Sequence, residues 1–170
     1  MRLTSKQIIE LLDLKKHPTC GFVSETYRSK QQIPKEALPP GYDGPRALGS
    51  VLYFMVAPDA QIVLHCIRAD QMYHHYLGDP LEVLLLYPDG TGRVTVVGSD
   101  LEGGMRPQSF IPAGTFHTSR LPPDSSYSLL GTSEWAGVEP SDVEIGNSEK
   151  LIKTYPGFAE QIRSFIPKSL

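Results

Sequence analysis

The feature that most constrains this chain is the regular recurrence of glycine and proline between short runs of strand-forming residues. The 15 glycines and 15 prolines are spread along the sequence rather than clustered, and "PDGTG" at 88–92 is a tight hairpin signal. The intervening runs contain mostly β-branched, aromatic and leucine residues, a composition typical of strands. They predict nine or ten short strands at 22–29, 48–56, 62–67, 72–77, 81–87, 93–98, 109–112, 115–119, 127–135 and 142–146.

Helical signals are found only near the two ends of the chain. Thr4 and Gln7 form a potential capping box for a helix over about 5–16, ahead of Pro18. At the other end, Asn147 or Ser148 can cap a short helix, and Pro156 can start another that runs to about Ile166, which gives a helical segment over about 148–167. Because no helix separates the strands, a parallel α/β sheet is excluded. The pattern predicts one domain over 1–170, an all-β sandwich or barrel of jelly-roll type with its core at about 20–146.

Composition narrows the possible partners and location. The net charge is −3 with both signs scattered, so no basic stripe predicts binding to nucleic acid. No apolar run approaches the ~18 residues of a membrane span, and the N-terminal residues lack the pattern of a signal peptide. Cys20 and Cys66 have no zinc-type spacing and are predicted to be free thiols. We therefore expect a cytoplasmic protein that binds neither nucleic acid nor membrane.

Two histidine-containing segments carry the clearest functional signal. "HCIRADQMYHHYLGDP" at 65–80 contains the pattern His65-x-Ile67-x3-Gln71-x6-Gly78. This pattern resembles the first motif of the cupin superfamily, His-x-His-x3-Glu-x6-Gly. Further along, "IPAGTFHT" ends with His117 and resembles the second motif, Pro-x-Gly-x2-His.

Both motifs occur in order, separated by the predicted hairpin. Together with "HPTCGFVSETYRS" and "QSFIPAGTFHT", they make residues 8 to about 145 similar to the small RmlC-like "cupin 5" group, long classed as a domain of unknown function. The resemblance implies a double-stranded β-helix barrel, a homodimer, and an internal cavity for a small molecule.

Metal-binding cupins hold their ion with three histidines and a carboxylate. This chain keeps His65 and His117, whereas Ile67 and Gln71 replace the second histidine and the glutamate. Two imidazoles and an amide make a poor transition-metal site, so we predict no cofactor. The alternative is a divalent metal bound by His65 and His117 with His75 as third ligand. Strand parity puts His75 on the Gln71 face, and a β-bulge would bring His74 inside instead.

RmlC-like epimerases need no metal and use a histidine base with a tyrosine acid. By this resemblance, His65 or His117 would be the base, with Tyr73, Tyr53 or Tyr27 as the acid. The substrate would be a small polar metabolite, such as a sugar or nucleotide-sugar, that is isomerised or epimerised. The alternative from another class is a non-catalytic small-molecule binding protein with the same fold.

Further residues are predicted to contact the ligand. Gln71, His75 and Tyr53 would be polar wall residues, and the apolar lining would come from Val63, Ile67 and Phe116. In "SETYRS", Glu25, Tyr27 and Arg28 suit a polar ligand, because a guanidinium binds carboxylates or phosphates. Alternatively, Glu25 and Arg28 pair at a sheet edge or dimer contact.

Strand parity turns Cys66 away from His65, which argues against a Cys–His nucleophile. The proline-rich loop 31–46 is predicted to be a lid or an arm.

Overall fold

The computed structural model describes residues 3–166 of the chain. Its helices are α1 (Ser5–Leu11), α2 (Ser148–Thr154) and α3 (Ala159–Phe165), with short 3₁₀ turns η1 (Lys35–Ala37), η2 (Pro140–Asp142) and η3 (Pro156–Phe158). Its strands are β1 (Lys15–His17), β2 (Gly21–Arg28), β3 (Gln32–Ile33), β4 (Arg46–Ala47), β5 (Ser50–Val56), β6 (His65–Ile67), β7 (Asp70–Gly78), β8 (Leu81–Leu86), β9 (Gly92–Val97), β10 (Gln108–Ile111), β11 (Phe116–Arg120), β12 (Ser128–Trp135) and β13 (Val143–Ile145).

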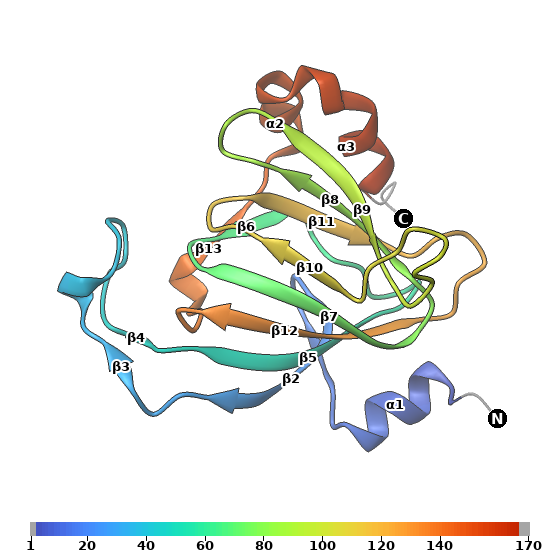
Figure 1. The fold of residues 1–170 in the computed structure, drawn as a ribbon, viewed down its shortest axis with the longest axis horizontal. Coiled ribbons are helices and arrows are strands. Elements are labelled where there is room, and N and C mark those ends of the chain that lie inside the picture. The colour runs from blue at the N-terminus through green and yellow to red at the C-terminus, as the bar shows by residue number, and fades with distance from the viewer. Residues whose placement is uncertain (1–2, 167–170) are drawn as a thin grey trace.

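Two antiparallel sheets face each other (Figure 1). One has six strands in the order β1-β2-β5-β12-β7-β10, and the other has five in the order β13-β6-β11-β8-β9. Strands that are neighbours in the chain often belong to opposite sheets, as in a jelly roll. The prediction of an all-β fold with helices only near its ends is confirmed.

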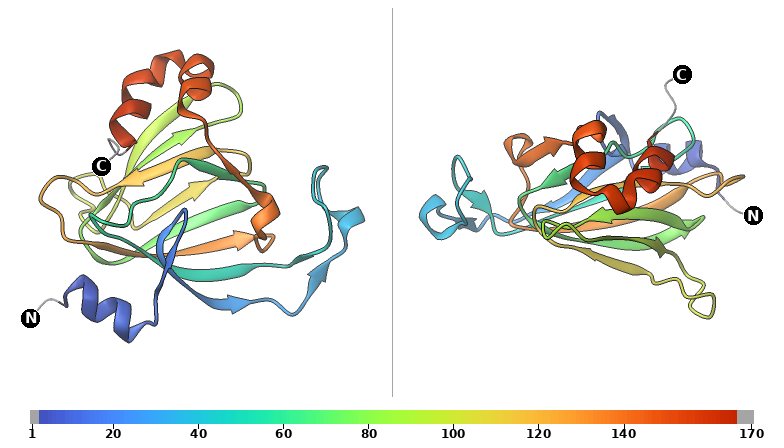
Figure 2. Two further views of the ribbon diagram at one scale, coloured as in Figure 1. Left: turned by 180° about the vertical axis from the view of Figure 1, so that it is seen from behind. Right: turned by 90° about the horizontal axis from the view of Figure 1, so that it is seen from above.

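The core lies between the two sheets and continues under the C-terminal helices. In β8, Leu81, Val83 and Leu85 point inward, where they pack with residues such as Phe54 from the opposite sheet. The alternate residues, such as Leu84, point outward against α2 and α3. These helices cover the outer face of the five-stranded sheet (Figure 2). Because β8 is buried on both faces, its sequence is an almost continuous apolar run.

The N-terminal helix begins as predicted and ends earlier than predicted. Thr4 and Gln7 form the capping box, with the Thr4 hydroxyl accepting from the Gln7 N–H at 3.3 Å. The helix ends at Leu11 rather than near residue 16, and Asp13 has a left-handed φ of 50°. The backbone then turns into β1, which pairs with β2, so the predicted extension of the helix to residue 16 is wrong. Tertiary pairing of these residues outweighs their helical propensity.

The C-terminal prediction of two short helices is confirmed within the described residues; its last position, 167, lies outside them. The Asn147 side chain accepts a hydrogen bond from the Lys150 N–H at 2.9 Å and so caps α2. Cys20 and Cys66 are both free thiols, as predicted.

Among residues 3–166, none of the helices has the length and apolar character that crossing a membrane requires.

The proline-rich segment forms an arm. Residues 29–47, with the short β3–β4 pair, extend away from the barrel in Figure 1. The base of the arm is fixed by Arg46, which is 4% exposed and donates to both Asp142 carboxylate oxygens, at 2.6 and 2.8 Å. The Arg46 guanidinium also lies over the Tyr42 ring. The arm therefore starts and ends at fixed points of the barrel.

Candidate functional site

The barrel encloses a cavity of about 560 Å³ between the two sheets. A second hollow of about 600 Å³ lies against α3, but Asp59 is its only charged lining residue. Val63, predicted for the barrel cavity, lines this second hollow instead, because residues 62–64 precede β6 without joining its ladder. The titratable groups concentrate in the barrel cavity, which is therefore the candidate site. It is lined by His17, Pro18, Thr19, Cys20, Val23, Glu25, Arg28, Leu52, Phe54, Ile62, His65, Ile67, Gln71, Tyr73, Thr132, Glu134, Val138, Glu139, Pro140, Val143 and Ile145.

His65 and His117 are cross-strand partners on β6 and β11, and their ring centroids are 4.3 Å apart. Their exposed fractions are 4% and 0%. Burial lowers the pKa of His65, and burial together with the His65 ring holds the pKa of His117 well below its usual value. Both imidazoles are therefore neutral at pH 7.

The hydrogen bonds of the two rings assign them different roles. The His65 Nδ1 lies 2.7 Å from the Val63 carbonyl oxygen, which can only accept, so Nδ1 carries the proton. Its Nε2 is left with a lone pair and has no hydrogen-bond partner among residues 3–166. In His117, Nδ1–H donates to the Thr115 carbonyl oxygen and Nε2 accepts from the Gln71 amide at 3.1 Å. His117 is satisfied behind the cavity wall, whereas His65 lines the cavity with a free base.

Tyr73 lies beside the histidine pair and also lines the cavity. Its ring packs against Phe54 at 4.7 Å and against His117 at 6.0 Å between centroids. Burial raises the Tyr73 pKa well above 10, so the group is a neutral phenol. In the described part of the chain its hydroxyl has no hydrogen-bond partner, although the residue is 3% exposed. Because Tyr73 lines the cavity, its hydroxyl is open to a hydrogen bond from a ligand or water there.

A row of polar residues crosses the six-stranded sheet on its inner face. In register, Arg28 on β2 lies opposite Ser50 on β5, Ser50 opposite Glu134 on β12, and Glu134 opposite Gln71 on β7. The Ser50 hydroxyl donates to the Glu134 carboxylate at 2.6 Å. Burial raises the pKa of Glu134. Glu134 is not among the residues predicted from the sequence, although it has the same strand parity as Leu130 and Thr132, which could have indicated its inward position.

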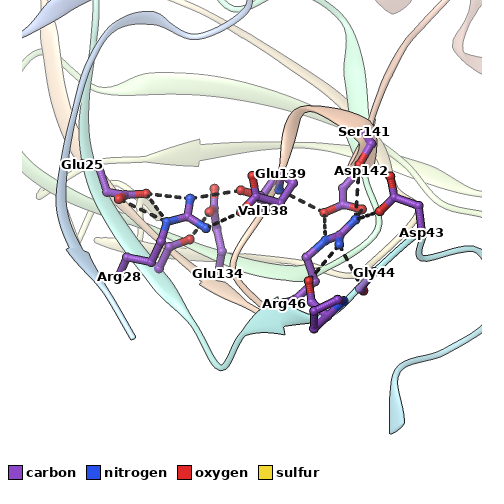
Figure 3. A network of polar contacts seen from close by, with 12 residues as sticks. Glu25, Arg28, Asp43, Gly44, Arg46, Glu134, Val138, Glu139, Ser141 and Asp142 are labelled. Atoms are coloured by element: carbon purple, nitrogen blue, oxygen red, sulfur yellow. Dashed lines mark hydrogen bonds and ion pairs between the residues drawn. The ribbon is translucent and has the colours of Figure 1, made fainter. Parts of the chain in front are cut away.

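Arg28 lies at the mouth of the cavity between two carboxylates (Figure 3). It donates to both Glu25 carboxylate oxygens, to Glu139 at 2.9 Å and to the Val138 carbonyl oxygen at 3.1 Å. Glu25 and Arg28 thus line the cavity and pair with each other. Tyr27 does not line it and is 58% exposed. The register between β2 and β5 shifts between Glu25 and Tyr27, and this irregularity turns Arg28 inward in place of Tyr27.

Neither of the two adjacent histidines on β7 reaches the cavity. His75 lies opposite Leu130, which fills the interior at that level, and its Nε2 donates to the Asp79 carbonyl oxygen at 3.1 Å. His74 is on the outer face, where it contacts the Ser133 hydroxyl at 3.1 Å. The predicted ligand role of His75, and the alternative with His74, are therefore wrong for this cavity.

Tyr53 and Phe116 also lie outside the cavity. Tyr53 is on the outer face of the six-stranded sheet, with its ring 5.9 Å from that of Tyr76 and close to the cluster under α1. Phe116 packs on the outer face of the five-stranded sheet against the C-terminal helices. Neighbouring strand residues point to opposite faces, so the inward position of His117 requires Phe116 to point outward.

The side chains around the histidine pair do not provide the set of ligands that a transition metal requires. Ile67 lines the cavity and offers no donor atom, and the Gln71 amide nitrogen is hydrogen-bonded to the only available nitrogen of His117. Within residues 3–166, no group of three His, Cys, Asp or Glu side chains is arranged to hold an ion. The histidine pair lacks the third nitrogen, sulfur or oxygen ligand that zinc or iron requires.

Comparison with known proteins gives a family and three relatives. The family model described as "Cupin superfamily (DUF985)" matches residues 6–146. An uncharacterised protein of Saccharomyces cerevisiae is 28% identical over 127 residues, which cover 72% of this chain and 63% of the yeast protein. The chain thus matches less than two thirds of that relative's length.

Two solved structures are similar along almost their whole length. A hypothetical protein from Leishmania major has a TM-score of 0.85 at 25% identity, with 96% of this chain and 98% of that chain covered. A protein from Shewanella oneidensis has a TM-score of 0.82 at 26% identity, with 98% and 99% covered. Their names assign no activity, so the site itself has to indicate the chemistry.

Proposed function

The chain belongs to the cupin superfamily (DUF985), and we propose that it is a metal-independent acid–base enzyme that isomerises or epimerises a small, sugar-like metabolite in the barrel cavity. The observation that supports this most is the His65 imidazole, neutral and with a free Nε2, in the same cavity as the unpartnered Tyr73 hydroxyl, which comes from the opposite sheet. A base and a proton donor that share one cavity are what such chemistry requires.

In this proposal His65 removes the proton from a carbon next to a carbonyl group. The C–H electron pair forms the double bond of an enediolate, and the proton moves to Nε2, which produces an imidazolium held by the Val63 carbonyl oxygen. The Tyr73 hydroxyl donates to the developing oxyanion. In the isomer route, the imidazolium returns its proton to the neighbouring carbon on the same face, while the hydroxyl proton passes to the former carbonyl oxygen, so that His65 is neutral again. In the epimer route, a solvent water protonates the same carbon from the opposite side, and the hydroxide that remains takes up the proton from Nε2 of His65.

The remaining polar wall would orient the substrate. Gln71 uses one amide hydrogen for His117 and keeps the other for a ligand. The Thr132 hydroxyl is 3.5 Å from the Gln71 carbonyl oxygen, a weak contact that a ligand hydroxyl can replace. Because His117 is satisfied, its role is to hold Gln71 and the His65 ring in place.

The test is exchange of substrate hydrogen with solvent. We expect the protein to exchange a carbon-bound hydrogen of at least one aldose or ketose in heavy water, followed by proton NMR. His65→Gln should lower the exchange rate by about 10² to 10⁴-fold while ligand binding is retained, and Tyr73→Phe should also lower it. His74→Gln, on the outer face, is the matched control and should not change the rate.

Two outcomes would count against the enzyme. If His65→Gln exchanges as fast as the unmodified protein, His65 is not the base. If a sugar binds in the cavity but no hydrogen is exchanged, the protein is a non-catalytic binding protein with the same fold. Titration calorimetry on the same samples separates binding from turnover.

We also propose that the protein acts as a homodimer. Support comes from large apolar side chains exposed on one barrel face, where Trp135 is 52% and Phe110 is 44% exposed on strands of the six-stranded sheet. Light scattering of the purified protein should give twice the mass of the 18.8 kDa chain. A mass equal to that of one chain would reject the dimer.

A further inference from the structure

The charged groups around the cavity leave no free cation for an anionic ligand. Arg28 is the only lysine or arginine among the lining residues. Four of its five N–H groups already donate: one from Nε to Glu25, one from Nη1 to Glu139, and two from Nη2 to Glu25 and the Val138 carbonyl oxygen. Figure 3 shows the guanidinium held between these acceptors. Its charge is therefore neutralised within the protein.

The carboxylates at the cavity outnumber this single cation. Glu25 and Glu139 carry two negative charges at the mouth against one positive charge on Arg28, and Glu134 lies deeper and is 8% exposed. Burial lowers the pKa of both lining histidines, His17 and His65, so they add no positive charge at neutral pH.

Backbone donors at the mouth are also used. In the turn η2, the Glu139 N–H donates to the Asp142 carboxylate at 3.0 Å, and the Asp142 N–H donates to the Glu139 carbonyl oxygen at 2.8 Å. These two N–H groups are therefore not available to a phosphate oxygen. A phosphate or carboxylate in the cavity would lose its hydration next to like charges, which is unfavourable in a partly buried site.

We propose that the cavity selects uncharged polyhydroxylated ligands and excludes phosphorylated, carboxylated and nucleotide-linked ones, with Glu134 and the Glu25–Arg28–Glu139 cluster as the specificity determinants. The inference rests on the proposed function in that it takes the same cavity as the binding site. It narrows the expected substrates from sugars and nucleotide-sugars to free sugars. Neutral hydroxyl groups suit the wall because Gln71 and Tyr73 can donate to them and Glu134 can accept from them.

The first test compares matched ligands on the unmodified protein. Titration calorimetry would use free pentoses and hexoses, their monophosphates, their uridine diphosphate conjugates and the corresponding uronic acids. We expect at least one free sugar to bind at least about ten times more tightly than its phosphate, conjugate and uronic acid counterparts, which corresponds to 1.4 kcal/mol. Equal or tighter binding of a charged counterpart, or no binding of any free sugar, would overturn the proposal.

The second test removes the two carboxylates that pair with the Arg28 guanidinium, and it does not depend on the identity of the sugar. In the double variant Glu25→Gln/Glu139→Gln, both carboxylates that neutralise the guanidinium become amides. We expect this variant to bind inorganic phosphate at least about tenfold more tightly than the unmodified protein does, because a free guanidinium binds phosphate oxygens. The single variant Glu139→Gln keeps the Glu25 contact and should gain less, and circular dichroism would verify folding of both.

The matched control is Glu102→Gln/Glu160→Gln, two exposed glutamates away from the cavity. Both double variants remove two carboxylates and change the formal net charge from −3 to −1. The control should not gain phosphate affinity. Equal gains in the two double variants, or no gain in Glu25→Gln/Glu139→Gln, would overturn the role of the cluster.

The hydrogen-exchange assay separates this inference from the proposed function. Selective binding of a free sugar without exchange would reject the enzyme and leave the selectivity intact. Exchange on a sugar phosphate but on no free sugar would reject the selectivity and leave the acid–base enzyme intact.

Discussion

Replacing Asp142 by alanine is expected to destabilise the fold by about 3–5 kcal/mol, because it leaves the buried Arg46 guanidinium without its counter-charge. Arg46 and Asp142 are 4% and 3% exposed and form two parallel hydrogen bonds, at 2.6 and 2.8 Å. The Asp142 carboxylate also accepts from the Glu139 N–H. Urea denaturation at pH 7 would measure the loss in free energy of unfolding.

Asp43 provides the matched control. It pairs with the same guanidinium at 2.5 Å, but its side chain is 66% exposed. Asp43→Ala should therefore destabilise the fold much less than Asp142→Ala does, because water screens an exposed ion pair. Arg46→Met/Asp142→Leu should recover most of the stability, since an apolar pair of similar volume avoids the desolvation of both charges. A loss for Asp142→Ala no larger than that for Asp43→Ala would contradict the prediction.

The second large effect is acid sensitivity caused by the buried histidines. The pKa values of His65 and His117 are lowered in the folded state, so below the usual histidine value of about 6.5 the unfolded chain binds protons that the folded chain does not. Their contribution to stability is fully present above pH 6.5 and is lost as the pH falls through the lowered values. Each group contributes a slope of up to about 1.4 kcal/mol per pH unit in that window.

The measurement is the free energy of unfolding from urea denaturation at several pH values between 7.5 and 5.5. The unmodified protein should lose up to about 2.7 kcal/mol per pH unit below 6.5 from the two histidines, and His117→Gln should lose about half as much. The raised pKa of Glu134 has the opposite effect on stability: its contribution is lost as the pH rises from about 4.5. Because Glu134 is present in both proteins, it does not change the difference between their slopes. Identical slopes in the two proteins would show that His117 takes up a proton in the folded state.

The fold could be predicted from the sequence because its signals are local and consistent. Glycine and proline separate the strands, and the alternation in β8 places Leu81, Val83 and Leu85 on one face. The two cupin-like motifs indicated that the distant segments around His65 and His117 lie close together in the fold. The end of α1 was missed, because residues 15–17 form a strand only through their pairing with β2, a long-range contact that helix propensity does not contain.

The site was predicted less completely than the fold, because a single inserted residue reverses strand parity. The irregularity between Glu25 and Tyr27 turns Arg28 toward the cavity, and nothing in "SETYRS" marks it. The prediction that Phe116 lines the cavity was wrong for a different reason. Once His117 is placed inside the barrel, strand parity alone puts the neighbouring Phe116 outside.

Glu134 was missed for a third reason. A glutamate in a strand is usually solvated, and its burial here depends on Ser50 and Gln71 from two neighbouring strands. Only the assembled sheet brings these partners together.

The turn at 138–142 has a consequence for how this protein can vary. Its first residues hold Arg28 at the cavity mouth through Val138 and Glu139, and its last residue holds Arg46 at the base of the arm. The shape of the cavity mouth and the anchoring of the arm thus depend on the same five positions. A substitution that changes the stability of this turn would therefore also move the groups at the cavity mouth, so these two properties cannot vary independently along the chain.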